Sequence, residues 1–200
     1  MVSNTKEIAL EQAIQKHLTD FTTEELAGQP QPDSPGKFRI GLSEDFDSQY
    51  ALDTKLFWEF LEHTQHKELE KLKTRNPSDW DRKILERFDR MIKKHGVLHL
   101  LKKGLQVDDA FFVLMHPAPL ASSSAKVHEN FAANIFSVTR QVRYSQANPL
   151  EEIDMALFLN GLPLVTLELK NAWTGQTARY HGQKQYKKDR DTGQPLLQFG

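Results

Sequence analysis

The segment EEIDMALFLNGLPLVTLELKN, residues 151–171, constrains the fold of this 200-residue chain most strongly. Two apolar runs flank Asn160-Gly161. Asn and Gly both tolerate the positive φ angles that a tight hairpin turn requires. The runs have the length and the aliphatic and aromatic content of strands. We therefore expect a hairpin of two buried strands, over 152–159 and 163–170.

Three charged side chains interrupt this apolar hairpin. Asp154 lies at the start of the first strand, and Glu168 and Lys170 lie at the end of the second. Residues two apart on a strand share a face, so Glu168 and Lys170 point the same way. Charges in such a strand are costly unless they are paired or bind a metal. The pattern therefore indicates a functional cluster.

The chemistry of these side chains suits a divalent cation. Two carboxylates from adjacent strands can hold one hard cation and leave coordination positions for water. Hydrolysis of a phosphodiester bond needs this arrangement, because the metal neutralises charge in the transition state and lowers the pKa of a bound water. Magnesium fits the oxygen ligands, and Lys170 could orient the water. The alternative is a structural Glu–Lys pair, which the E-x-K triplet alone does not exclude.

The register of the hairpin makes a shared metal site testable. In an antiparallel pair, directly opposed residues point to the same face. A regular two-residue turn would pair Leu159 with Leu162, and Asp154 would then oppose Leu167 and face away from Glu168. Shared ligation requires Asp154 to oppose Glu168. We therefore predict an odd-length loop or a β-bulge between these two carboxylates.

Hydrophobic periodicity predicts the other elements. Helices are expected over 5–20, 54–73, 176–190, and between a cap at Ser78 and an end at Gly96. Further strands are expected over 97–101, 110–115 and 135–144. The predicted fold class is α/β, with a mixed central sheet flanked by helices and a helical insertion at about 54–95. The final residues, LLQFG, end on an apolar run, which suggests a fragment of a longer chain.

Composition excludes several classes of protein. The chain has no cysteine, which excludes disulfides, cysteine zinc sites and thiol nucleophiles and is compatible with the cytosol. No apolar run is long enough to span a membrane, and early charges argue against a secretory signal, so we expect a cytoplasmic protein. The formal net charge is −1. Basic residues exceed acidic ones in 61–120, a block that we interpret as solvated helix faces.

The hairpin and its flanking segments resemble the N-terminal nuclease domain of the R (restriction/translocation) subunit of type I restriction endonucleases, a domain of the PD-(D/E)XK superfamily. The shared pattern is an Asp before an apolar strand, then NGLP, then an apolar strand ending in E-L-K-N. Arg140-Gln141, the segment HGVLHLLKKG at 95–104, and Gln185-Tyr186 with the following KDRD also match.

The resemblance implies roles for the charged residues of the hairpin and the first helix. Asp154 and Glu168 would be metal ligands, and Lys170 the catalytic lysine. The family also places a glutamate of its first helix near the metal. Glu11 is the better match, because it lies partly on the apolar side of that helix, and Glu7 is the other candidate. An exposed helix carboxylate is the alternative for Glu11.

One family motif departs from its usual form here. The family carries Q-x-x-x-Y on the helix after the lysine, but Gly182 stands four residues before Tyr186. We assign Gln183 to act with Tyr186, because residues three apart share a helix face. The segment QTARY at 176–180 has the right spacing but lies very close to the lysine.

The resemblance also implies the function and the partners. Residues 1–200 would form one nuclease domain that cleaves double-stranded DNA with Mg²⁺, as part of a type I site-specific deoxyribonuclease. No phosphate-binding P-loop is present, so a C-terminal helicase-like motor, outside these residues, would use ATP. Modification (methyltransferase) and specificity subunits would be partners, and a membrane would not. Basic side chains of 176–190, Arg190 among them, are candidates for phosphate contacts.

Two other functions remain open at this point. The chain could be a different PD-(D/E)XK nuclease, from a repair or phage system, with the same catalytic residues and other partners. It could also be a non-catalytic DNA-binding or assembly module, although the presence of Asp154, Glu168 and Lys170 together argues against a module that has lost catalysis.

Overall fold

The computed structural model describes residues 2–32, 34, 36–148, 150–169, 190–191 and 193–198. Within these ranges the helices are α1 (Val2–Thr19), α2 (Thr23–Leu26), α3 (Thr54–Arg75), α4 (Trp80–His95), α5 (Val97–Lys103) and α6 (Ala125–Ala132). The strands are β1 (Arg39–Ile40), β2 (Phe46–Asp47), β3 (Leu52–Asp53), β4 (Leu105–Val107), β5 (Ala110–Phe112), β6 (Phe136–Arg143), β7 (Glu152–Leu159) and β8 (Leu162–Leu167). Short 3₁₀ helices are η1 (Ser43–Asp45) and η5 (Pro195–Gln198).

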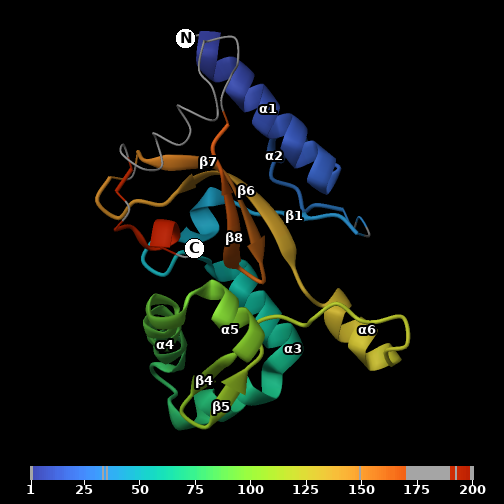
Figure 1. The fold of residues 1–200 in the computed structure, drawn as a ribbon, viewed down its shortest axis with the longest axis vertical. Coiled ribbons are helices and arrows are strands. Elements are labelled where there is room, and N and C mark those ends of the chain that lie inside the picture. Colours follow the sequence, from blue (N-terminus) through green and yellow to red (C-terminus); the bar gives the residue numbers. More distant parts are fainter. Residues whose placement is uncertain are drawn as a thin grey trace.

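The central sheet has the strand order β1-β6-β7-β8 (Figure 1). β1 runs parallel to β6, whereas β6, β7 and β8 are antiparallel to their neighbours. The strands expected over 135–144, 152–159 and 163–170 correspond to β6, β7 and β8. The predicted α/β class, a mixed central sheet with helices around it, is therefore confirmed.

Polar contacts join α1 and α2, which lie beside the sheet near β6 and β1 (Figure 1). Thr22 caps α2, because its hydroxyl accepts a hydrogen bond from the backbone N–H of Glu25 while the Glu25 carboxylate accepts one from the N–H of Thr22. The buried Gln15 of α1 accepts a hydrogen bond from the backbone N–H of Thr23 at 3.0 Å. These contacts fix the two helices relative to each other.

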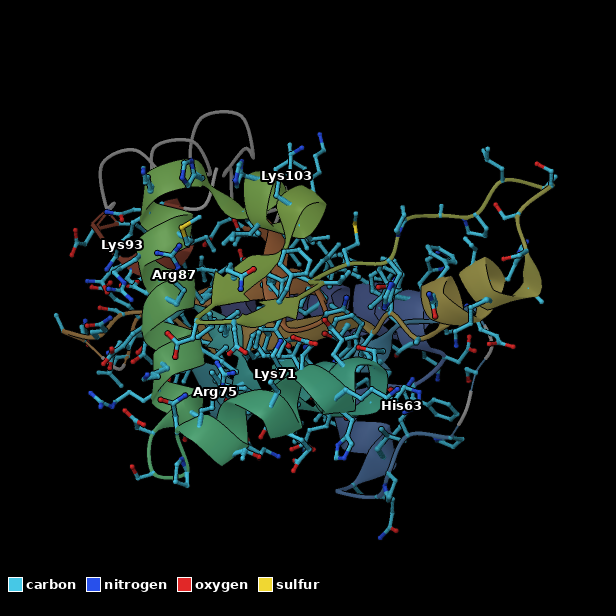
Figure 2. The ribbon with its side chains drawn as sticks, turned by 90° about the horizontal axis from the view of Figure 1, so that it is seen from below. His63, Lys71, Arg75, Arg87, Lys93 and Lys103 are labelled. Carbon is cyan, nitrogen blue, oxygen red and sulfur yellow. The ribbon has the colours of Figure 1, made fainter. Side chains whose placement is uncertain are left out.

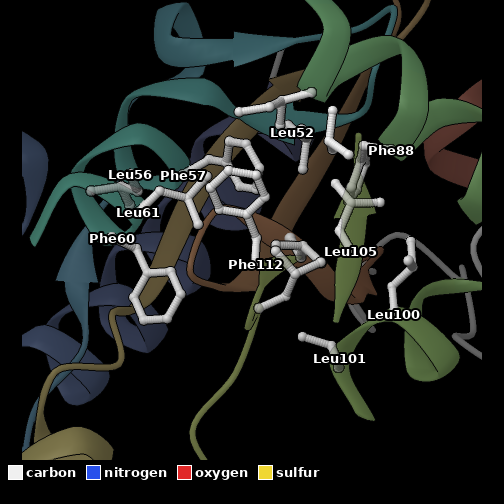
Figure 3. Close-up of a cluster of buried hydrophobic side chains, with 14 of the residues drawn as sticks. Leu52, Leu56, Phe57, Phe60, Leu61, Phe88, Leu100, Leu101, Leu105 and Phe112 are labelled. Atoms are coloured by element: carbon white, nitrogen blue, oxygen red, sulfur yellow. The ribbon is translucent and has the colours of Figure 1, made fainter. Parts of the chain in front are cut away.

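The largest apolar cluster lies below the sheet in Figure 1, among α3, α4, α5 and the β4–β5 hairpin (Figures 1 and 3). The first of these helices contributes Leu56, Phe57, Phe60 and Leu61, all of them buried. Gly96 ends α4 with a φ of 77°, as the sequence predicted. The turn between β7 and β8 packs on this cluster through Leu159 and Leu162.

Three local expectations were wrong. The segment expected as a strand over 97–101 is helix α5, because its buried residues Leu100 and Leu101 follow a helical rather than an alternating spacing from Val97. The strand expected over 110–115 is shorter and pairs only with β4, outside the central sheet. The N-cap of α4 is Asp79 rather than Ser78.

Basic side chains of the middle block spread along α3, α4 and α5, where Figure 2 labels Lys71, Arg75, Arg87 and Lys93. Several have acidic neighbours: Arg75 contacts Asp109 at 2.7 Å, and Lys93 pairs within its own helix at 2.8 Å. These contacts support the interpretation of this block as a solvated, ion-paired surface. Across the described ranges, no helix combines the length and the apolar character needed to cross a bilayer.

Candidate active site

The turn between β7 and β8 is anchored on both sides. Asn160 and Gly161 have φ angles of 53° and 81°, so the hairpin has the two-residue turn with positive φ at both positions. The buried Asn160 side chain accepts a hydrogen bond from the N–H of Ile135 at 2.7 Å and donates one to the carbonyl of Leu114 at 2.9 Å. A Cβ atom at Gly161 would lie 2.4 Å from the carbonyl of Asp53. Packing therefore requires the NG pair, whatever its role in chemistry.

A β-bulge follows this turn in β8. Phe158 pairs with Pro163, yet the neighbouring Leu157 pairs with Val165. Leu164 is thus an extra residue on β8. The predicted bulge between the two carboxylates is confirmed, in combination with a regular two-residue turn.

The bulge sets the relation between the two strand carboxylates. The last ladder pair is Met155 with Leu167, and the same register continued by one residue places Asp154 opposite Glu168. Opposed residues of an antiparallel pair share a face. The N–H of Leu169 donates a hydrogen bond to Asp154 Oδ2 at 2.5 Å, so the end of the second strand lies beside the first carboxylate.

Strand β6 is also irregular beside Asp154. The β6–β7 register would pair Gln141 with Asp154, but that pair is missing from the ladder and Gln141 has a φ of 52°. The Ser43 hydroxyl donates to the carbonyl of Gln141 at 2.7 Å and accepts from the N–H of Arg143 at 3.3 Å, which stabilises this conformation. Both neighbours of β7 therefore depart from regular geometry near the same carboxylate, and strand irregularities are common next to active sites.

A buried ion pair joins the first helix to the sheet. Glu11 of α1 and Arg140 of β6 have side chains that are 5% and 8% exposed, and Arg140 Nε lies 3.2 Å from Glu11 Oε2. Arg140 Nη1 also lies 2.8 Å from the Glu24 carboxylate of α2. Burial raises the pKa of Glu11, Arg140 opposes that shift, and the negative charges of Asp154 and Glu152 raise the pKa further. The charge of Asp154 thus contributes to the raised pKa of Glu11.

A second buried ion pair involves the other strand carboxylate. Glu168 and Arg190 have side chains that are 4% and 7% exposed, and Arg190 Nη2 lies 2.5 Å from Glu168 Oε2. Arg190 Nη1 donates to the backbone carbonyl of Glu152 at 2.9 Å. The expectation that Arg190 contacts DNA phosphates from an exposed basic segment is therefore corrected, because its guanidinium points inward to Glu168.

Several predicted site residues cannot be placed against this geometry. Lys170, Gln183 and Tyr186 lie outside the described residues, and so does the predicted helix 176–190 apart from Arg190. Their roles stay predictions. Of the two glutamates considered on the first helix, Glu11 is buried and senses Asp154, whereas Glu7 is only half-buried. That observation favours Glu11, although its role at a metal stays a prediction too.

The described donor set has the chemistry that magnesium prefers, although it does not by itself form a complete centre. Within the described part of the chain, no group of three or more histidine and acidic side chains is arranged to hold an ion. Asp154 and Glu168 offer hard oxygen ligands from opposed positions of adjacent strands. A divalent cation would also offset the repulsion that Asp154 exerts on Glu11. The residues present therefore fit Mg²⁺.

The sequence singled out the carboxylates as candidates but did not indicate that Arg140 and Arg190 would pair with Glu11 and Glu168. Arg140 carried a usable signal, because it is a charge inside the apolar strand NIFSVTRQV, as Asp154 is in its own strand. Arg190 carried no such signal, since it stands among other charged residues and meets Glu168 only through the fold.

A comparison with family models identifies the chain. The model described as the type I restriction enzyme R protein N terminus matches residues 6–200. Comparisons with curated proteins and with solved structures give no match. The matched range includes Glu11, the hairpin with Asp154 and Glu168, and the segment that ends in Arg190. This chain belongs to the family of type I restriction enzyme R protein N-terminal regions.

Proposed function

We propose that this region is a magnesium-dependent endonuclease that hydrolyses DNA phosphodiester bonds as part of a type I restriction enzyme. The observation that carries the proposal is the bulged hairpin, whose register places Asp154 opposite Glu168. The extra residue in β8 brings the two carboxylates to the same face of the hairpin, and packing alone does not readily explain this arrangement. Membership of the R protein family supports a role in restriction.

Each site residue has a role in this proposal. Asp154 and Glu168 would hold Mg²⁺, which when bound neutralises phosphate charge and acidifies a coordinated water. Lys170 would orient the attacking water and stabilise developing negative charge. In the sequence it directly follows Leu169, whose N–H donates a hydrogen bond to Asp154. Glu11, held by Arg140, would add a third carboxylate.

The segment after the lysine and the remainder of the enzyme would complete the activity. Gln183 and Tyr186 would act together near the DNA backbone. Double-stranded DNA would be the substrate, and the modification and specificity subunits would supply methylation and sequence recognition. ATP would be used only by a helicase-like motor beyond these residues, and the assembly would work in the cytoplasm.

The test is a cleavage assay on the full-length assembly with Mg²⁺ and ATP. Asp154→Asn, Glu168→Gln and Lys170→Arg should each lower DNA cleavage by about a hundredfold or more, because each removes charge or geometry needed in the transition state. DNA binding and ATP hydrolysis should persist. Glu129→Gln, a neutralised carboxylate on the exposed surface of α6, is the matched control and should cut normally. Cleavage close to wild type in Asp154→Asn or Glu168→Gln would overturn the proposal.

A further inference from the structure

We propose that Arg190 is a positioning residue that holds the Glu168 carboxylate and joins the two strands that carry the site, so that the metal meets preorganised ligands. The inference rests on the proposed function, because it concerns how the same site is kept in shape. It assigns a role to a residue that lies 22 positions beyond Glu168 in the chain.

The guanidinium of Arg190 reaches two strands at once. Nη1 donates to the backbone carbonyl of Glu152, the first residue of β7, at 2.9 Å. Nη2 binds Glu168 Oε2, just past the end of β8, at 2.5 Å. A planar guanidinium has its donors in a fixed fork, so the two contacts are geometrically coupled. Movement of one strand end relative to the other would break at least one of them.

The position of the Arg190 bridge matters because the hydrogen-bonded ladder between β7 and β8 ends before it reaches Asp154 and Glu168. The last β7–β8 pair is Met155 with Leu167, and the two carboxylates are opposed one residue further on. Beyond that pair, the contacts that join the two strand ends include the hydrogen bond from the backbone N–H of Leu169 to Asp154 and the bridge made by Arg190.

The surroundings of Arg190 keep its side chain in place. Its guanidinium lies 5.1 Å from the centre of the Tyr144 ring, a cation–π contact. The Tyr144 hydroxyl in turn donates to Glu151 Oε2 at 3.0 Å, and Tyr144 is fully buried. A long side chain held on a fixed aromatic ring loses little further freedom when a metal binds. This is the property expected of a residue that orients a ligand.

Arg190 also supplies the charge that burial of Glu168 demands. A carboxylate that is only 4% exposed needs a counter-charge, and Arg190 provides it at contact distance. Residues that orient metal ligands from the second layer around the ion typically change metal affinity by about 10–100-fold when they are replaced. The expected effect is therefore on metal binding and not on the maximal rate.

The experiment measures Mn²⁺ binding to the metal-free full-length R protein by isothermal titration calorimetry. Wild type should bind Mn²⁺. Arg190→Lys keeps the charge but loses the fork, and should raise the Mn²⁺ dissociation constant about tenfold with little change in the unfolding midpoint. Arg190→Gln, which also loses the charge, should weaken binding further. Arg87→Lys, the same substitution at a half-buried arginine of α4, is the control and should bind as wild type does.

Cleavage in the full assembly gives the second readout. In Arg190→Lys the Mg²⁺ concentration for half-maximal cleavage should rise about tenfold, while the rate at saturating Mg²⁺ should stay within a few fold of wild type. Unchanged or tighter Mn²⁺ binding in both Arg190 variants, beside a wild type that binds, would overturn this inference alone. A wild type that binds no Mn²⁺ would overturn the metal site itself and this inference with it.

Discussion

The α3–α5 region and the candidate active site are both buried, but they are held together by opposite means. The first packs apolar side chains such as Phe57, Phe60 and Phe112, none of which is more than 1% exposed (Figure 3). Removal of such surface from water stabilises a fold directly. The second buries carboxylates beside arginines, and the cost of desolvating them offsets much of their attraction. The contrast indicates that burial of the apolar region stabilises the fold, and that this stability offsets the cost of burying charged groups in the site.

The largest effect should come from the apolar region. Phe57 is fully buried and packs against Trp58 and Phe88, with ring centroids 5.1 and 5.9 Å away. Phe57→Ala should lower the free energy of unfolding by about 3–5 kcal/mol, because it removes buried surface and leaves a cavity. Urea unfolding measures the loss. Phe111→Ala, at a ring that is 44% exposed, is the control and should cost far less. Similar losses at the two positions would contradict the comparison.

A smaller loss should follow from leaving a charge unpaired in the site. Arg140→Met keeps an apolar stem but leaves Glu11 buried without its main counter-charge. The free energy of unfolding at pH 7 should fall by about 3 kcal/mol. Glu11→Gln added to the same chain should recover part of that loss, since the carboxylate charge is then gone. A double-mutant cycle measures the coupling. Additive effects of the two substitutions would mean that the pair is not coupled.

An increase in stability is expected from a substitution at Asp53, the N-cap residue of α3. Its Oδ1 caps the helix by accepting from the N–H of Leu56 at 3.0 Å, whereas Oδ2 is buried and has no hydrogen-bond partner among the described residues. Burial raises the pKa of Asp53 from 3.8 to about 6. The folded protein therefore binds its proton more tightly than the unfolded chain, so stability falls as pH rises between these two values.

Asp53→Asn should remove that penalty and keep the cap. The variant should be more stable than wild type by about 2 kcal/mol at pH 8, and the difference should shrink to well under about 1 kcal/mol near pH 4, where Asp53 is protonated in the folded state and about half protonated in the unfolded chain. Urea unfolding at pH 8, 6 and 4 gives the comparison. A variant that is no more stable than wild type at pH 8 would show that the buried charge carries no cost.

The smallest effect should come from an exposed ion pair. Arg82 and Glu86 lie one turn apart on α4 with a closest distance of 3.2 Å, and their side chains are 63% and 49% exposed. Arg82→Ala and Glu86→Ala should show a coupling below about 0.5 kcal/mol, because water screens the pair. A double-mutant cycle on this pair, set beside that for Glu11 and Arg140, measures how much burial changes an ion pair. Equal coupling energies in the two cycles would mean that burial does not change the strength of the ion pair.

Local patterns were sufficient to predict much of this fold. The NG turn, strands β7 and β8, and the helices α3 and α4 all follow from spacing that is visible in the sequence. An odd-length loop or a bulge could be deduced because two carboxylates that are to share an ion cannot sit in an unbulged two-residue hairpin, but its place at Leu164 could not. The short apolar run at 97–101 was misread because a run of that length fits a strand or a buried helix equally well.

The contacts around the carboxylates could not be predicted in the same way. Arg140 meets Glu11 across 129 residues, and Arg190 meets Glu168 across 22. No period or motif relates such positions, because only tertiary structure places α1 on β6 and Arg190 beside Glu168. The φ of 52° at Gln141 is likewise a product of its contacts with Ser43. The sequence thus indicated the candidate site residues, and the tertiary structure determined which side chains contact them.

The extra residue Leu164 also limits how the length of this chain can change. Loss of Leu164 alone would remove the bulge but leave Asp154 opposite Glu168, because the pairs beyond the bulge would keep their partners. Loss of a second residue from β8 would place Met155 opposite Glu168 and turn the two carboxylates to opposite faces. Substitution of the exposed Leu164 itself leaves the count intact. Insertions and deletions should therefore be tolerated in the exposed loop at 117–124, whereas in β8 only a length change that keeps Asp154 opposite Glu168 should be tolerated, even where the side chains of that strand are free to vary.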